Sequence, residues 1–194
     1  MLRLQQSVDI LICRVEMMKH NLHLDFETRS HANIKTSGAW VYAKHPTTEI
    51  MCLAYALNDE APVLIRREDI RPDSEPVTTL KTLLARLDGD MVISAHNAFF
   101  EWCVWVHQMV PKLGFLPLKR TAMRCTMAQC AAHALPQNLL KEGLALGLDT
   151  IKNEADGRVL LKLCKPRPAR YGGGWYEGDA DYEKLYRYNI DDIH

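Results

Sequence analysis

The sequence lacks the features that mark membrane and secreted proteins. It contains no apolar run long enough to span a bilayer, so we expect no membrane association. Residues 1–17 carry charges and no cleavage-site pattern, which argues against a signal peptide. The six cysteines are scattered without a C-x-x-C pair, so we expect free thiols in a reducing cytosol rather than zinc ligands or disulfides.

An excess of charge of one sign is also missing. The chain has 24 basic and 24 acidic residues, which argues against a protein that coats duplex nucleic acid by charge alone. A nuclease is not excluded, because bound metal ions supply local positive charge. The 194 residues contain no low-complexity tract and suffice for one globular domain with a sizeable core.

The hydrophobic pattern predicts an α/β domain with antiparallel strands first and crossover units later. The expected strands are 21–27, 50–57, 62–65, 91–94 and 118–122. The expected helices are 76–87, 97–109, a helix ending near Ala134, 138–146, 155–163 and one from Asp179, its N-cap, to the end. A loop with exposed Trp40 and Tyr42 is predicted after the first strand, and Gly89 is predicted to end the first of these helices.

The first strand carries two acids on one face. Side chains alternate along a strand, so Asp25 and Glu27 lie opposite Leu22, Leu24 and Phe26. Neighbouring carboxylates repel each other, and a cation between them relieves the repulsion. Oxygen ligands without a nearby Cys or His pair favour Mg²⁺ or Mn²⁺ over zinc. The alternative is an exposed edge strand with two solvated acids.

Two further segments carry candidate polar residues. Glu101 follows a buried strand and lies in the first turn of a helix, where the helix dipole favours its charged form. Asn97, at the start of that helix, is either a cap or a ligand contact. Tyr188 and Asp192 are four apart and share a helix face, so Asp192 rather than Asp191 is the expected ligand. Taken singly, each could be an ordinary surface group.

Together the three segments resemble the exonuclease motifs of the DEDD superfamily, the ribonuclease H-like 3′–5′ exonucleases. The matching residues are Asp25 and Glu27 (D-x-E), Asn97, Phe100 and Glu101 (N-x-x-F-D), and Tyr188 and Asp192 (Y-x-x-x-D). Arg187 stands where the histidine subclass has its His, which indicates the tyrosine subclass. That subclass includes the proofreading domains of family A DNA polymerases and the RNase D-like enzymes.

The resemblance extends beyond the motifs and covers about residues 20–194. The stretches at 25–30, 38–43, 125–128, 135–139 and 152–167 look like those of phage-type DNA polymerase I proteins. The resemblance implies a ribonuclease H-like mixed sheet flanked by helices. Residues 18–194 would form the exonuclease domain, and residues 1–17 either an optional helical extension or an upstream start. Family members continue into a polymerase region, so we expect the last helix to be cut short at His194.

By this resemblance, the domain is a monomer in a bacterial or phage-infected cytoplasm and releases nucleoside 5′-monophosphates from single-stranded DNA 3′ ends. Two Mg²⁺ or Mn²⁺ ions about 4 Å apart would clamp the attacking and leaving oxygens. Asp25 would bridge both ions, Glu27 and Asp192 would complete the first site, and Glu101 would support the second. Tyr188 would orient the attacking water, since a phenol with a pKa of about 10 is a poor base at neutral pH.

Three residues are candidates for contacts with the nucleic acid: Thr28 through its backbone N–H, and Asn97 and Phe100 through the second motif. Phe26 and Phe99 are expected in the core instead. Glu101 departs from the family pattern, which has Asp at this position. Its extra methylene shifts the carboxylate by about an ångström or more. Two alternatives remain. One is RNase D-like trimming of RNA, which uses the same site; the other, which Glu101 keeps open, is a degenerate exonuclease fold that serves only as a nucleic-acid-binding or docking module.

Overall fold

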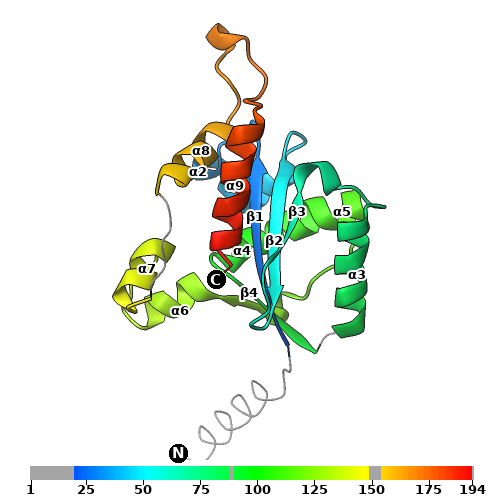
Figure 1. Ribbon diagram of the computed structural model, residues 1–194, viewed down its shortest axis with the longest axis vertical. Helices are drawn as coiled ribbons and strands as arrows, with labels where there is room; N and C mark the ends of the chain where they lie inside the picture. Colours follow the sequence, from blue (N-terminus) through cyan, green and yellow to red (C-terminus); the bar gives the residue numbers. More distant parts are fainter. Residues whose placement is uncertain (1–19, 88–89, 149–153, 194) are drawn as a thin grey trace, which may run out of the picture.

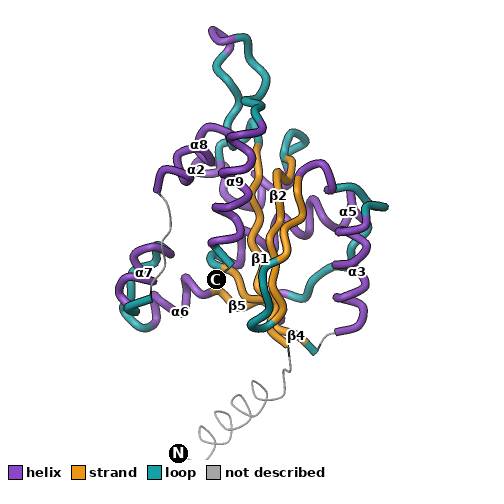
Figure 2. The backbone as a smooth tube through the Cα atoms, viewed as in Figure 1, coloured by secondary structure: helices purple, strands orange, loops and turns teal. Residues whose placement is uncertain are grey.

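The computed structural model describes residues 20–87, 90–148 and 154–193. A five-stranded sheet of order β3-β2-β1-β4-β5 forms its centre (Figures 1 and 2). The strands are β1 (His20–Arg29), β2 (Glu49–Leu57), β3 (Val63–Arg66), β4 (Met91–Ala95) and β5 (Met123–Cys125). β2 runs antiparallel to β1 and β3, whereas β4 runs parallel to β1 and β5. The predicted mixed sheet is thus confirmed.

Helices flank this sheet on both faces (Figure 1). They are α2 (Ile34–Lys44), α3 (Glu75–Leu87), α4 (Ala98–Val104), α5 (Val110–Leu113), α6 (Thr126–Ala132), α7 (Leu139–Ala145), α8 (Glu154–Leu163) and α9 (Asp179–Asp191). A π-helical segment, Trp105–Met109, joins α4 to α5. No helix in the described part of the chain is both long and apolar enough to cross a bilayer.

The two faces of β1 have different partners. Leu22, Leu24 and Phe26 are buried in the larger core, together with residues of α3 and of the α4–α5 segment. Burying each such side chain stabilises the fold by about 1.5–3 kcal/mol. On the opposite face, Cys52 of β2 packs with Leu185 of α9 and with α8. The acids of β1 share that second face, so the alternation of the strand places them beneath α9.

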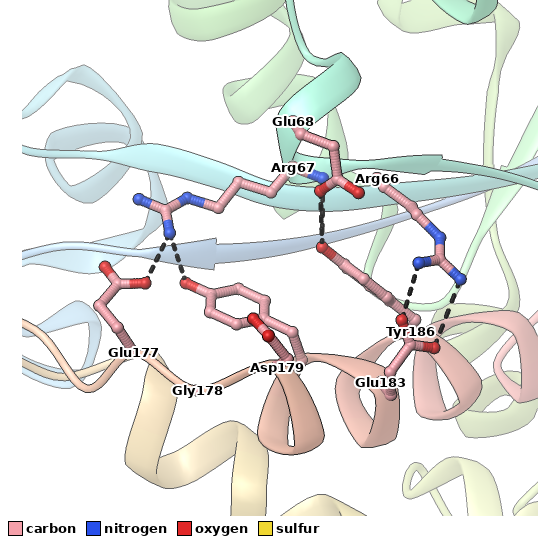
Figure 3. A pocket seen from close by; sticks show the side chains of 9 residues that line it. Arg66, Arg67, Glu68, Glu177, Gly178, Asp179, Glu183 and Tyr186 are labelled. Atoms are coloured by element: carbon pink, nitrogen blue, oxygen red, sulfur yellow. Dashed lines mark hydrogen bonds and ion pairs between the residues drawn. The ribbon is translucent and has the colours of Figure 1, made fainter.

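Ion pairs fix α9 against the sheet. Arg67 donates to Glu177, just before α9, at 2.6 Å, and Arg66 donates to Glu183 at 2.7 Å (Figure 3). Arg29, at the end of β1, is 2% exposed and pairs with Glu177 at 2.8 Å. A buried arginine needs such partners, because an uncompensated charge in the interior is costly. These contacts set the position of the helix that ends beside the candidate site.

The predicted loop after β1 is wrong, because residues 34–44 form α2. The Asn33 side chain caps this helix by accepting from the Lys35 N–H at 3.0 Å. Gly38 interrupts the helical dihedrals with φ of 74°, and such a break weakens the helical pattern in the sequence. Tyr42 is buried, contrary to expectation, whereas Trp40 is 41% exposed as predicted.

Three other boundaries differ from the prediction. The last strand lies at 123–125 rather than 118–122, because residues 120–122 form a 3-10 turn. The helix expected to stop before Pro111 continues to Leu113, since proline follows a π segment where the usual hydrogen-bond pattern is already interrupted. Gly178, not Asp179, occupies the N-cap position of α9.

The described cysteines agree with the expectation of free thiols. Cys52, Cys103, Cys125, Cys130 and Cys164 are all unbridged. The predicted N-terminal extension at 1–17 and the predicted helix stop at Gly89 lie outside the described residues.

Candidate metal centre

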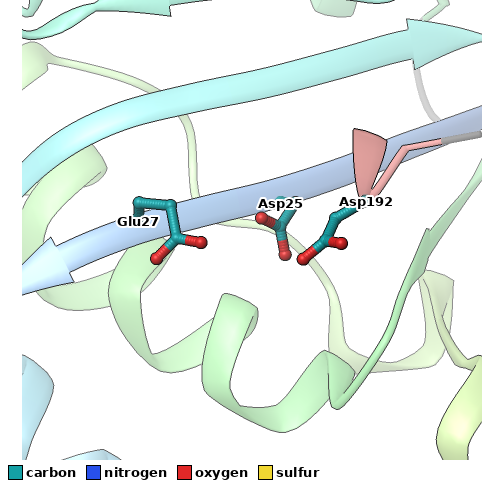
Figure 4. A group of neighbouring side chains, drawn as sticks. All are labelled: Asp25, Glu27 and Asp192. Carbon is teal, nitrogen blue, oxygen red and sulfur yellow. The ribbon is translucent and has the colours of Figure 1, made fainter. Parts of the chain in front are cut away.

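Three carboxylates from distant parts of the chain meet on the α9 face of the sheet. Asp25 and Glu27 point from β1 toward Asp192, which follows the last residue of α9 (Figure 4). Each offers an oxygen, and these oxygens all lie within 4.8 Å of one another. β1 is the middle strand of the sheet and Glu27 is buried, so the alternative of an exposed edge strand does not hold.

Small neighbours leave room for the acids of β1. Ala54 and Cys52 of β2 stand opposite Asp25 and Glu27 in the register. Burial raises the pKa of the Cys52 thiol well above its ordinary value, and the charges of Glu27 and Asp25 raise it further. Cys52 is therefore a neutral packing residue at neutral pH.

The end of α9 points one of its two acids into the cluster. Leu185 is fully buried, Tyr188 and Asp192 are half-buried, and Asp191 is exposed. The helix periodicity thus places Asp192, and not Asp191, beside β1, as expected. A carboxylate at a helix C-terminus faces the negative end of the helix dipole, which disfavours its charge unless a cation lies nearby.

Asn189 is a site residue that sequence reasoning missed. It is fully buried, and its Nδ2 donates to Asp25 Oδ2 at 2.6 Å and to the Asp25 carbonyl oxygen at 3.3 Å. These bonds fix the orientation of the Asp25 carboxylate. The sequence shows only that Asn189 lies three residues before Asp192, on the same side of α9, and this spacing does not reveal the contact with β1.

Glu101 approaches β1 from α4. Pairing between β1 and β4 extends only from His20–Met91 to His23–Ser94, so the later residues of β1 have no partner in β4. The Phe26 N–H instead donates to Glu101 Oε2 at 3.1 Å. This hydrogen bond holds Glu101, which is 2% exposed, beside the two acids of β1.

The Glu101 carboxyl is electrostatically frustrated. Burial raises its pKa well above the ordinary value, and the charges of Asp25, Glu27 and Asp192 raise it further, against the opposing effect of the Phe26 N–H. The expectation that the helix dipole favours the charged form is therefore wrong for the protein without metal. Desolvation and the neighbouring like charges raise the Glu101 pKa more than the dipole of α4 lowers it.

The donor set fits a divalent cation. All four side chains offer carboxylate oxygens, which are the ligands that Mg²⁺ and Mn²⁺ prefer. A divalent charge would also offset the mutual repulsion that raises the Glu101 pKa. The group formed by Asp25, Glu27 and Asp192 could thus hold a metal ion, with Glu101 adjoining it.

The remaining candidate residues lie around this centre. Thr28 is buried, and its Oγ1 lies 3.0 Å from the Tyr42 hydroxyl. Asn97 occupies the N-cap position of α4 in a left-handed conformation, but its side chain caps nothing in the described structure. Phe100 is half-buried, with its ring 6.0 Å from that of Tyr42. Phe99 is 50% exposed, so its predicted place in the core is wrong.

The amino-acid sequence is similar to part of a known DNA polymerase. Over 153 residues it is 31% identical to a DNA polymerase of Bacillus phage SP02. The match covers 76% of this chain and 22% of that polymerase. No family model matches the sequence.

Part of a solved structure, the family B DNA polymerase from the hyperthermophilic archaeon Pyrobaculum calidifontis, has a similar fold. It matches with a TM-score of 0.53 and 16% identity, over 90% of this chain and 23% of that one. The likeness supports the ribonuclease H-like fold. The chain is thus similar to part of a DNA polymerase, and neither match singles out the family A exonucleases.

Glu101→Gln is expected to stabilise the metal-free protein by about 1–2 kcal/mol at pH 8. Gln keeps the acceptor for the Phe26 N–H and removes the buried charge. Glu101 holds its proton more tightly in the folded than in the unfolded chain, so it costs stability as pH rises above its ordinary value of 4.5. Denaturation at pH 5 and pH 8 in a chelator should show the larger gain at pH 8. An equal gain at both would contradict this.

Asp192→Asn is expected to weaken Mn²⁺ binding at least tenfold, or by about 1.4 kcal/mol. Asp191→Asn is the matched control, because it removes the same charge from an exposed neighbour and should change the affinity less than about twofold. Titration of both variants with Mn²⁺ checks the register of α9. Equal losses would show that the wrong acid has been assigned.

Proposed function

We propose that the chain is a metal-dependent 3′–5′ exonuclease domain that removes nucleoside 5′-monophosphates from single-stranded DNA. The observation that carries this proposal is the convergence of Asp25, Glu27 and Asp192 within 4.8 Å, with Glu101 adjoining them. Similarity to a phage DNA polymerase supports a role in DNA processing. Tyr188 stands four residues before Asp192, and Arg187 stands where the histidine subclass has its His, which favours the tyrosine subclass, as in family A polymerases.

The residues of the site would have distinct tasks. Asp25, Glu27, Asp192 and Glu101 would hold two Mg²⁺ or Mn²⁺ ions, and the chemistry these ions would supply is the ionisation of a water and stabilisation of charge on the phosphate. Asn189 keeps the Asp25 carboxylate in one orientation through its 2.6 Å hydrogen bond. Tyr188, one turn before Asp192 on a rigid helix, would orient the attacking water through its hydroxyl.

Groups at the edge of the centre would contact the terminal nucleotide. Thr28 lies directly after Glu27 on β1, and its backbone N–H would contact the nucleotide. Asn97 is the N-cap residue of α4, and Phe100 directly precedes Glu101 on that helix. In this proposal residues 18–194 act as one domain on a DNA 3′ end.

The proposal is tested with a 5′-labelled 20-nucleotide DNA strand in Mg²⁺, in Mn²⁺ and in EDTA. The expected result is a ladder that shortens from the 3′ end only when metal is present, with nucleoside 5′-monophosphates as products. A matched RNA strand and a blunt duplex serve as comparisons. Faster degradation of the RNA would favour the RNA-trimming alternative, and internal cuts would rule out an exonuclease.

Tyr188→Phe is expected to lower the cleavage rate by about 10- to 100-fold, or roughly 1.4–2.8 kcal/mol of transition-state stabilisation. The change removes only a hydroxyl from a half-buried ring, so DNA binding should stay nearly constant. Single-turnover rates and equilibrium binding in EDTA measure the two effects separately. An unchanged single-turnover rate would remove Tyr188 from the site.

A further inference from the structure

A stack of three aromatic rings lies on the surface formed by α2 and α4. Trp102 of α4 stacks between Trp40 of α2, with ring centroids 5.6 Å apart, and Phe99, at 6.2 Å. The interplanar angles are 28° and 24°. The outer rings are unusually accessible, with Trp40 41% and Phe99 50% exposed. We call Trp40, Phe99 and Trp102 the aromatic platform.

The platform stands on the two helices that contact β1 beside the carboxylates. Phe99 and Trp102 lie on α4 within one turn of Glu101, which contacts β1 through the Phe26 N–H. α2 and α4 pack against each other, and the Tyr42 hydroxyl of α2 lies 3.0 Å from Thr28 Oγ1, one residue after Glu27. The same two helices therefore border the centre and display the platform.

The two segments that carry Trp40 and Trp102 contain no acidic residue. Residues 28–48 and residues 102–141 have no Asp or Glu, although the chain as a whole has 24 acidic and 24 basic residues. The basic residues of these two segments are Arg29, Lys35, Lys44, Lys112, Lys119, Arg120, Arg124 and Lys141. Glu101 adjoins them in sequence but is buried. An acid-free stretch of this length favours an anionic partner.

One of these cations, Arg120, contacts the platform directly. The Arg120 guanidinium lies 5.3 Å from the centre of the Trp102 ring. His107 contacts the Trp40 ring at 4.2 Å, and its pKa is lowered by burial and then by the positive charge of Lys44. Exposed rings with cations beside them are the combination that binds single-stranded nucleic acid, because every base has a face that stacks and every nucleotide a phosphate. An apolar protein partner would not require the absence of acids.

We propose that the aromatic platform binds bases of single-stranded nucleic acid, upstream of the 3′ end that the carboxylates hold. Phe99 is the outermost ring of the stack and would carry the first stacked base. The direction of the strand, with its 3′ end at the carboxylates, rests on the proposed function, whereas stacking of bases on the platform does not. The platform would thus hold the strand while terminal nucleotides leave.

The test is binding without metal, so that no cleavage interferes. A 5′-fluorescein dT12 oligonucleotide and a 12-unit abasic sugar-phosphate chain are titrated in EDTA with the wild type, Phe99→Ala and Trp40→Ala. Tyr171→Ala is the matched control, since this ring is 56% exposed and lies outside the platform. Loss of one stacked base is expected to weaken dT12 binding at least fivefold. The abasic chain should bind all four proteins within twofold of one another.

Each outcome decides the point. Wild-type affinity for dT12 in both platform variants overturns the proposal and leaves the platform to a protein partner. Equal losses for dT12 and for the abasic chain overturn stacking as the cause. Hydrolysis of thymidine 5′-monophosphate p-nitrophenyl ester by the wild type with Mn²⁺ reports on the carboxylates alone. If this ester is not cleaved but base-dependent binding requires Phe99, the platform stands and the exonuclease proposal fails.

Discussion

Asp25→Ala is expected to lower metal-dependent cleavage by at least about 10³-fold, or about 4 kcal/mol of transition-state stabilisation. Asp25 lies in the centre of the sheet between Glu27 and Asp192, so no other side chain can replace its carboxylate. Single-turnover cleavage of a labelled DNA strand in saturating Mn²⁺ measures the effect. Asp191→Asn, on the exposed side of α9, is the control and should retain most of the activity.

The fold of this variant should remain intact. The substitution relieves repulsion with Glu27 but leaves the buried Asn189 amide without its 2.6 Å partner. These two effects oppose each other, each by about 1 kcal/mol, so the metal-free melting temperature should stay close to that of the wild type. Retention of most metal-dependent cleavage by a folded Asp25→Ala protein would contradict the proposed site.

The second large effect is expected at Glu101, where Glu101→Gln should lower the rate by about 10²- to 10³-fold, or roughly 2.7–4 kcal/mol. Gln keeps the size of the side chain and the acceptor for the Phe26 N–H, but removes the negative charge. Glu101→Asp restores the usual residue of the motif and should be active. Mn²⁺ should support the wild type better than Mg²⁺, because Mg²⁺ demands stricter octahedral geometry.

The Glu101 series also separates an enzyme from a degenerate fold. Single-turnover rates of the wild type, Glu101→Asp and Glu101→Gln are measured in each metal. A silent wild type with an active Glu101→Asp would identify a disabled exonuclease that serves as a binding module. Equal rates for Glu101→Gln and the wild type would show that Glu101 takes no part in the chemistry.

The strands around the site could be predicted because their signals are local. Side chains alternate along a strand, so the pattern Leu24, Asp25, Phe26, Glu27 places the apolar side chains on the core face of β1 and both acids on the other face. The four-residue spacing of Tyr188 and Asp192 predicted the inward acid of α9 for the same reason.

What the sequence did not reveal depends on contacts between distant segments. The sequence pattern predicts a loop at 34–44 because Gly38 interrupts the helical periodicity, whereas the structure forms α2 there and packs it against α4. The role of Asn189 depends on α9 crossing β1, which no local spacing encodes. The raised pKa of Glu101 required the three neighbouring charges and its burial, which outweigh the helix end that the sequence shows.

The most direct test of the central claim is the number of Mn²⁺ ions bound per chain, measured by electron paramagnetic resonance with thymidine 5′-monophosphate present. The proposed centre predicts saturable binding of two ions to the wild type and loss of this binding in Asp25→Ala, with Asp191→Asn unchanged. Undiminished Mn²⁺ binding in Asp25→Ala, or no saturable binding in the wild type, would contradict the assignment of these carboxylates as a metal centre.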